Sequence, residues 1–302
     1  MKNKMVHKPV LVEEVIDNLN LGNGKIVVDC TLGAGGHSLK ILQCIAPGGR
    51  LIGIDQDKDI LEIASENLKA YKDNINLLYG NFKDIDNLIR SIGIEKVDAV
   101  LYDLGVSSLQ LDTPERGFSF KSEGPLDMRM DKAAAISAFD LVNNLPRYEL
   151  RKVLSQYGQE RQAGKIANLI VEKRKLAPIE STVTLSRIVT EAYPYKARFS
   201  KIHPATRTFQ ALRIAVNNEL DIIQMSIAKA VDILNSQGRI GVIAFHSLED
   251  RIIKNTFKHC ASEQLLKIIT KKPIRPSSKE VIENPRSRSA RLRVAEKVKV
   301  LK

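Results

Sequence analysis

Glycines and carboxylates with the spacing of a nucleoside-binding site stand in the first part of this chain. An apolar run ends at Asp29 and leads into a glycine-rich segment, residues 33–37, and a second apolar run, residues 51–54, ends at Asp55. In an open α/β fold, such a glycine turn opens a helix at the carboxyl edge of a parallel sheet, where the backbone approaches the ligand closely. A carboxylate that ends the next strand accepts hydrogen bonds from both ribose hydroxyls. The pattern therefore predicts a site for a nucleoside cofactor.

The spacing of the glycines bears on which cofactor is bound. A dinucleotide site has the pattern Gly-x-Gly-x-x-Gly, and its third glycine lets the helix touch the strand. After Gly33 and Gly35, the third position of that pattern is Ser38. S-adenosylmethionine has no phosphate and needs only a close turn and an acid for its ribose, so the pattern favours this cofactor. For the glycines alone, a tight structural turn without a ligand is the alternative.

A third carboxylate, Asp103, ends the apolar run that begins at Val97. The exocyclic amine of a base is a poor nucleophile because its lone pair is delocalised into the ring, and a nearby acceptor localises that pair. Asp103 suits this catalytic role, but it suits equally a contact with the cofactor's ammonium group or a strand cap. Methylation of a pyrimidine carbon needs a thiolate. The segments after Asp103 and Phe245 contain no cysteine, and Cys30 is interpreted as a small buried residue, so transfer to nitrogen or oxygen is favoured.

Alternating strand-like and helical patterns position these residues. Strand-like runs cover residues 25–29, 50–55, 75–79, 97–103 and 239–245, and helical patterns between the early ones cover 37–46, 58–71 and 84–92. Repeated β-α units predict an α/β fold with a mostly parallel sheet and helices on both faces. Residues 265–270 and 290–300 alternate as in a closing antiparallel hairpin, and the polar stretch 271–288 predicts a mobile loop.

The β-α rhythm stops near Leu111, and helical patterns follow at residues 133–143, 148–157, 161–175 and 183–192. We therefore predict a discontinuous core, residues 1–110 and 215–302, with an inserted helical domain, residues 111–214. A long helix over residues 214–236 leads back to the sheet. Because the insertion leaves the carboxyl end of a strand, where α/β folds bind their ligands, we expect it to recognise the substrate.

The net charge of +12 is unevenly distributed over the 302 residues. Residues 1–110 hold 12 basic against 15 acidic side chains, residues 111–214 hold 18 against 11, and residues 271–302 hold 11 against 3. Such a split favours a nucleic acid partner over a generally basic surface. Residues 196–213 combine basic and aromatic side chains without an acid, as a surface for phosphates and stacked bases would: Lys196, Arg198, Lys201, Arg207 and Arg213 with Phe199, His203 and Phe209.

Further basic residues extend the predicted RNA contacts. Arg116, Arg129 and Arg151 are candidates in the insertion, and Arg286, Arg288, Arg291 and Arg293 are candidates for a second contact with the RNA backbone. No apolar run reaches the length of a membrane span, and the first residues lack the apolar core of a secretory signal, so a cytoplasmic protein is expected. Three cysteines are too few for a disulfide framework or a metal cluster, and no metal is expected.

Several blocks of the chain closely resemble the bacterial small-subunit ribosomal RNA cytosine-N4 methyltransferases, a family called RsmH and formerly MraW. The similarity runs from His7-Lys-Pro-Val-Leu11 to residues 284–290, and its most specific blocks are residues 103–112, 116–120, 124–130, 203–213 and 245–251. The resemblance implies a class I, Rossmann-like fold with a seven-stranded sheet. It also implies methyl transfer from S-adenosylmethionine to N4 of a cytidine in the decoding region of 16S ribosomal RNA, within the small subunit.

Matched position by position, the resemblance places the cofactor contacts on Gly35, Gly36, His37, Asp55, Phe82, Asp103 and Gln110. From the residues alone, Phe82 is either an adenine-stacking aromatic or a core residue. Likewise His246, Glu249 and Asp250 line the base pocket, or Ser247 and Glu249 cap the next helix. A ribosome-assembly factor without catalysis and a dinucleotide-dependent oxidoreductase are the alternative functions. The sequence leaves open whether the chain is a monomer or a homodimer.

Overall fold

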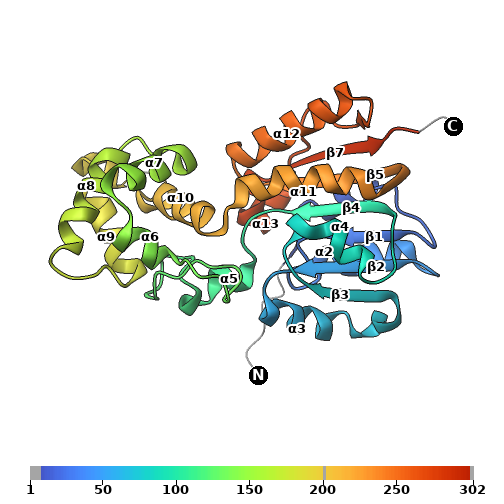
Figure 1. Cartoon of the computed structure of the whole chain (residues 1–302), viewed down its shortest axis with the longest axis horizontal. Coiled ribbons are helices and arrows are strands. Elements are labelled where there is room, and N and C mark those ends of the chain that lie inside the picture. The colour runs from blue at the N-terminus through green and yellow to red at the C-terminus, as the bar shows by residue number, and fades with distance from the viewer. Residues whose placement is uncertain (1–7, 200–201, 300–302) are drawn as a thin grey trace. The chain divides into compact units, whose positions relative to one another are not determined.

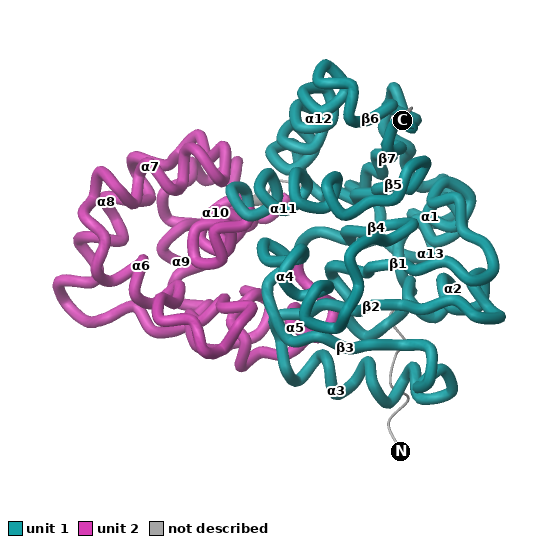
Figure 2. Tube along the Cα trace, turned by 45° about the vertical axis from the view of Figure 1, so that its right-hand side comes forward, with its two compact units in different colours: residues 1–105, 220–302 teal, residues 106–219 magenta. Residues whose placement is uncertain are grey.

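The computed structural model describes residues 8–199 and 202–299, and the chain divides into two compact units. Unit 1 comprises residues 1–105 and 220–302, and unit 2 comprises residues 106–219 (Figure 2). The observed boundaries thus lie five residues outside the predicted insertion, 111–214, at both ends. As a result Gln110, which was expected in the core, belongs to unit 2.

A seven-stranded sheet forms the centre of unit 1 (Figure 1). Its strands are β1 (Ile26–Asp29), β2 (Arg50–Asp55), β3 (Ile75–Tyr79), β4 (Val97–Asp103), β5 (Leu234–Ala244), β6 (Leu266–Ile268) and β7 (Arg291–Lys297). The strand order is β3-β2-β1-β4-β5-β7-β6. All pairs are parallel except those of β7 with β5 and β6. The predicted α/β class, the mostly parallel sheet and the closing antiparallel pair are confirmed.

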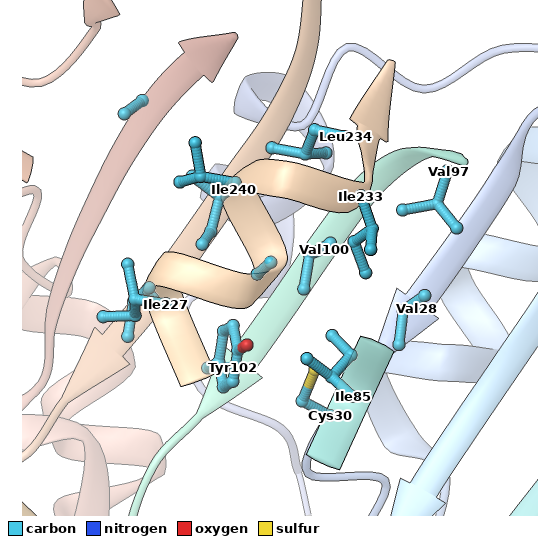
Figure 3. Packing of buried hydrophobic residues seen from close by; sticks show 14 of the residues in the cluster. Val28, Cys30, Ile85, Val97, Val100, Tyr102, Ile227, Ile233, Leu234 and Ile240 are labelled. Atoms are coloured by element: carbon cyan, nitrogen blue, oxygen red, sulfur yellow. The ribbon is translucent and has the colours of Figure 1, made fainter. Parts of the chain in front are cut away.

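Both faces of this sheet are covered, because successive residues of a strand point to opposite faces. Val28, Ile52 and Val100 point to one face, where α4 (Ile85–Arg90), α11 (Glu219–Ile233) and α12 (Ser247–Ser262) pack. Figure 3 shows this cluster, in which Ile85 and Ile227 approach the strands from their helices. The neighbours of those strand residues face α1 (Val12–Asn18), α2 (Gly36–Ile45) and α3 (Lys58–Asn67). The near-continuous apolar runs of the sequence are therefore those of strands buried on both sides.

The remaining helical segments of unit 1 are short. They are the 3-10 helices η1 (Lys69–Asn74), η2 (Phe82–Asp84) and η5 (Pro285–Ser289) and the α-helix α13 (Ser278–Glu283). Helix α13 lies within the stretch 271–288 and η5 begins there, so the prediction of a loop is wrong for residues 278–288. Ser277 caps α13 by accepting a hydrogen bond from the Glu280 N–H, and the following Asn284 is 9% exposed. Polar composition misled the prediction because these polar groups bond within the fold.

Unit 2 is helical and has a core of its own. It consists of α5 (Ser108–Asp112), η3 (Pro114–Arg116), α6 (Ala138–Asn144), α7 (Arg147–Gly158), α8 (Ala163–Arg174), α9 (Thr182–Glu191), η4 (Tyr195–Phe199) and α10 (Ala205–Asn217). Its core includes Leu150, Leu154, Ile166, Ile170 and Leu212, all fully buried. Spacings of three and four residues within α7 and α8 explain why the helical pattern was legible in the sequence.

The predicted single helix over residues 214–236 is wrong. Helix α10 ends at Asn217, Asn218 has a φ of 49°, and α11 begins at Glu219 and ends where β5 starts. Asparagine adopts this left-handed conformation more readily than most residues, so it ends a helix much as glycine does. The Asn217 amide also donates to the Met128 carbonyl and accepts from the Met130 N–H, which fixes the break.

Candidate functional site

The glycine turn joins β1 to α2 at the carboxyl edge of the sheet. Gly35 precedes α2 with a φ of 85°, a conformation that favours glycine. At Gly36 a side chain would come within 3.1 Å of Pro9. These two glycines therefore serve the turn and its packing. Asp29, at the end of β1, is buried, and its carboxylate accepts hydrogen bonds from the Ser38 hydroxyl at 2.7 Å and from the Thr31 N–H at 3.2 Å.

Asp55 ends β2 next to this turn, as predicted for the ribose-binding acid. Its two carboxylate oxygens accept hydrogen bonds from the backbone N–H groups of Gly33 and Asp57, each at 3.0 Å. Burial raises the pKa of this carboxyl to about 6, although these two hydrogen bonds oppose the effect. Because each carboxylate oxygen can accept more than one hydrogen bond, Asp55 retains the capacity for two hydroxyl donors.

Phe82 begins η2, directly after β3. Its ring meets that of Tyr102 edge to face, with centroids 5.5 Å apart, and packs half-buried against the sheet core. The Phe82 carbonyl accepts a hydrogen bond from the Ser226 hydroxyl at 2.7 Å. The core interpretation of Phe82 is therefore correct for one side of the ring. Stacking of the other side on an adenine stays a prediction.

Asp103 and His37 meet where β4 ends beside the start of α2. The His37 Nδ1 lies 3.6 Å from the Asp103 Oδ2, and both side chains are largely buried. The Asp103 N–H donates to the Thr31 hydroxyl at 2.6 Å. Its buried Oδ1 has no hydrogen-bond partner within the described parts of the chain. Burial raises the pKa of the Asp103 carboxyl to about 6, against the effect of His37. An unpaired carboxylate oxygen is costly, so this atom is suited to a ligand donor.

The residues after β5 form the cap of α12. His246 is the N-cap of α12, and the Glu249 carboxylate accepts hydrogen bonds from the N–H groups of Phe245 and His246 at 2.7 and 3.2 Å. Asp250 forms ion pairs with Arg291 and Arg293. Glu249 thus belongs to the cap, as one interpretation holds, but the N-cap residue is His246 and not Ser247. Arg293 is buried and Arg291 is partly buried, so both arginines bond within the fold, and their contact with RNA stays a prediction.

Gln110, the last predicted cofactor contact, lies in α5 of unit 2. Its side-chain oxygen accepts a hydrogen bond from the Ser107 N–H at 3.1 Å, and its own N–H donates to the Ser107 hydroxyl. This capping box begins α5 and buries the amide. This capping box could have been predicted from the sequence, because Ser followed three residues later by Gln is typical of a helix start.

Most of the arginines predicted to contact RNA bond within unit 2. Arg213 forms a two-pronged ion pair with Glu219, at 2.8 Å for both contacts, and Arg116 is buried against the carbonyls of Arg129 and Met130. Arg129 pairs with Asp127, and Arg198 donates to the Tyr193 and Glu191 carbonyls. His203 stacks on Phe120 with centroids 4.7 Å apart, and Phe209 is buried. Lys201 lies outside the described residues.

A different basic surface stands out in unit 2. Arg151, Arg161 and Lys165 are exposed and line a hollow of about 340 Å³ where α8 begins. Within the described ranges none of the three forms an ion pair. Buried Glu160 also lines the hollow, with its carboxylate bonded to the Tyr193 hydroxyl and the Gln162 N–H. Arg161 and Lys165 were missed in the sequence because the predicted helix 161–175 gives no sign of which basic side chains lack partners.

The residues of unit 1 fit S-adenosylmethionine on their own chemistry. Asp55 offers acceptors for two ribose hydroxyls, and the unpaired Asp103 Oδ1 offers an acceptor for an ammonium group or an amine. Asp103, His37 and Asp55 all stand at the carboxyl edge of the parallel strands, which is where such folds bind their ligands.

Within the described residues, no helix is both long and apolar enough to cross a membrane.

Comparison with known proteins identifies the family. Residues 4–298 match the model of the MraW methylase family. The chain is 48% identical to the ribosomal RNA small subunit methyltransferase H of Clostridioides difficile, over 97% of this chain and 99% of that protein. It is 49% identical to the protein of that name from Persephonella marina, at the same coverage. A solved rRNA methylase from Streptococcus thermophilus has a TM-score of 0.46 and 12% identity, over 98% of this chain and 99% of that one, which is too remote for inference. The chain belongs to the MraW methylase family and is an S-adenosylmethionine-dependent methyltransferase.

Proposed function

We propose that this methyltransferase modifies the N4 amine of one cytidine in the decoding region of 16S ribosomal RNA. The observation that carries the proposal is the buried, unpaired Oδ1 of Asp103 at the end of β4. When the amine donates a hydrogen bond to this oxygen, the electron pair of its nitrogen is less delocalised into the ring, so the nitrogen becomes a better nucleophile. The shared name of the relatives, ribosomal RNA small subunit methyltransferase H, supports the choice of RNA. Such a substrate also implies action in the cytoplasm.

The site residues divide the work of the reaction. When bound, S-adenosylmethionine supplies an electrophilic methyl group on a sulfonium. Asp55 accepts hydrogen bonds from the two ribose hydroxyls, and Phe82 flanks the adenine. Asp103 accepts one hydrogen of the cytidine amine, which orients the nitrogen lone pair toward the methyl carbon. The methyl group would pass to nitrogen, and sulfur would keep the electron pair of the broken carbon–sulfur bond. The Asp103 carboxylate would take the proton that nitrogen releases.

Unit 2 contributes contacts to the RNA backbone in this proposal. Arg151, Arg161 and Lys165, around the hollow at the start of α8, are exposed and form no ion pair among the described residues, so they have the charge and the accessibility that a phosphate requires. To reach the site, the target base must leave its stack. Contacts with flanking phosphates hold the strand while it does so.

Mass mapping of ribosomal RNA nucleosides tests the proposal. A strain lacking the gene is expected to lose N4-methylcytidine from its 16S RNA, and the wild-type gene, but not the Asp103→Asn variant, is expected to restore it. An unchanged content of this nucleoside in the deletion strain contradicts the proposal. Single-turnover transfer of labelled methyl groups to purified small subunits and to naked 16S RNA separates an enzyme from an assembly factor without catalysis.

A further inference from the structure

The first described residues meet the segment around α13 beside the candidate site. The Asn284 side-chain amide donates to the Lys8 carbonyl at 3.0 Å, and the Leu11 N–H donates to the Glu280 carboxylate at 2.8 Å. Lys8 and Glu283 add an exposed ion pair. Residues 8–11, Glu280 and Asn284 are called the terminal clasp below. The clasp joins the two blocks that bound the family resemblance, and the reaction described above leaves both without a role.

The terminal clasp holds one carbonyl group in a fixed position. Leu11 is fully buried and has a φ of 56°, a strained conformation for a leucine. Such strain persists only where the surroundings enforce it, and here the Glu280 carboxylate accepts the Leu11 N–H. The carbonyl of the preceding residue, Val10, lies 2.8 Å from the His37 Nε2.

This contact determines the tautomer of His37. A carbonyl oxygen only accepts hydrogen bonds, so the Nε2 must carry a hydrogen. The other ring nitrogen, Nδ1, faces the Asp103 Oδ2 at 3.6 Å, while the Asp103 Oδ1 stays available to a ligand. The clasp thus points the Nδ1 of His37 at the carboxylate.

We propose that the terminal clasp positions His37 so that its imidazole keeps the Asp103 carboxyl in the ionised form that accepts the amine hydrogen. His37 is then a positioning residue, because it acts through Asp103. The inference rests on the proposed role of Asp103 in methyl transfer. It gives a function to residues from both ends of the chain that lie outside the set of cofactor contacts.

The charges around Asp103 make such help necessary. Burial raises the pKa of its carboxyl to about 6, and the nearby acids Asp29 on β1 and Glu249 on α12 raise it as well. His37 on α2 is the group that opposes them. Removing the imidazole leaves only the raising effects, so the carboxyl should become harder to ionise. The acidic limb of the pH profile should therefore move to higher pH.

The tautomer is tested on the free protein by NMR of the chain labelled with nitrogen-15 in histidine. Of the five histidine signals, the one lost in His37→Asn is expected to show hydrogen on Nε2. In Glu280→Ala this signal is expected to show Nε2 only partly protonated, whereas Glu283→Ala, on the same helix but only in the exposed pair, leaves it unchanged. An Nε2 without hydrogen in the wild-type protein overturns the inference.

The effect on Asp103 is tested by the pH dependence of kcat with labelled S-adenosylmethionine and small subunits lacking the modification. In His37→Asn the acidic limb of the kcat profile is expected to move to higher pH by about one unit, the usual effect of one nearby charge. Glu280→Ala and Asn284→Ala should shift it less but in the same direction, with melting temperatures checked. An unmoved limb in His37→Asn overturns the inference. If the wild-type protein transfers no methyl group, the proposed function fails instead, and the NMR result stands separately.

Discussion

Two acids at the carboxyl edge of the unit 1 sheet differ from two acids of unit 2 in the partners that the fold gives them. At the carboxyl edge of the unit 1 sheet, burial raises the pKa values of Asp55 and Asp103, each to about 6. In unit 2, Asp127 is also partly buried, but hydrogen bonds from Arg129 outweigh the burial and lower its pKa, and a hydrogen bond from Ser137 lowers that of Asp140. Asp127 and Asp140 are satisfied by the fold itself, whereas Asp55 and Asp103 keep unused acceptor capacity. The comparison separates acids that stabilise the fold from acids that we propose to bind a ligand.

The largest expected effect is on Asp103. Asp103→Asn keeps the shape of the side chain but removes the basic acceptor, and we expect kcat to fall by about 10²- to 10⁴-fold, the usual contribution of a general base. Affinity for S-adenosylhomocysteine, measured by calorimetry, should change little. If affinity falls while kcat at saturation is retained, Asp103 holds the cofactor's ammonium group instead, and the unused acceptor belongs to cofactor binding.

The second effect is on cofactor affinity. Asp55→Ala removes two hydrogen bonds to a charged acceptor, worth roughly 1.5–3 kcal/mol each, so S-adenosylhomocysteine should bind at least about 100-fold more weakly. Asp57→Ala is the matched control: Asp57 is a buried N-cap of α3, and its loss costs about 1 kcal/mol of stability without a change in affinity. Equal losses of affinity in the two variants would mean that the turn, and not the Asp55 carboxylate, is what matters.

The strand-end acids were predictable from the sequence because two simple rules act together. Buried parallel strands appear as apolar runs, and their carboxyl ends meet at one edge of the sheet. Asp29, Asp55 and Asp103 follow such runs, and β2, β3 and β4 have the predicted bounds. The contact of His37 with the Val10 carbonyl could not be predicted, since it depends on a strained backbone at Leu11 that no local pattern specifies.

The partners of the unit 2 arginines, in contrast, could not be predicted from the sequence. Arg207 and Arg213 stand on the same helix and look equivalent in the sequence, yet Arg213 pairs with Glu219 and Arg207 donates only one long hydrogen bond, 3.3 Å, to the Gln159 carbonyl. The helix break at Asn218 is what brings Glu219 to Arg213. A basic residue that is read as a surface charge can thus be part of the fold, and only the positions of its partners decide which it is.

A third prediction concerns the stability of unit 2. Arg213→Ala leaves the Glu219 carboxylate, 8% exposed, without its partner, and breaking such a pair costs about 3 kcal/mol. The urea concentration at the midpoint of unfolding should fall in Arg213→Ala and stay nearly constant in Arg207→Ala. If the Arg213→Ala protein is as stable as the wild type but binds RNA more weakly, Arg213 contacts RNA and the ion pair does not stabilise the fold.

The pH dependence of cofactor binding is a fourth and smaller effect. The ribose hydroxyls need an ionised Asp55, so wild-type affinity for S-adenosylhomocysteine should be constant above pH 7 and fall about tenfold per unit below pH 6. Cofactor binding and ionisation of Asp55 are thermodynamically linked. If ionised Asp55 binds the cofactor more tightly, bound cofactor must in turn lower the pKa of Asp55. Calorimetry from pH 5 to 8 checks this. A decline that begins only below pH 4.5 would mean that the site does not raise the pKa of this acid.

The smallest effect is expected at the hollow of unit 2, where we propose that each cation contacts RNA from the surface. Arg151→Ala and Arg161→Ala should each weaken RNA binding and reduce the slope of log affinity against log salt by about 0.7, the value for one phosphate contact on a single strand. Neither arginine forms an ion pair within the described residues, so stability should be unchanged, in contrast to Arg213→Ala. Lys152→Ala, also exposed on α7 but outside the lining of the hollow, is the matched control. If Lys152→Ala reduces the slope of log affinity against log salt equally, the hollow is not a specific site and RNA contacts a diffuse basic surface. The reason is that counterion release depends on charge near the phosphate and not on the shape of the surface.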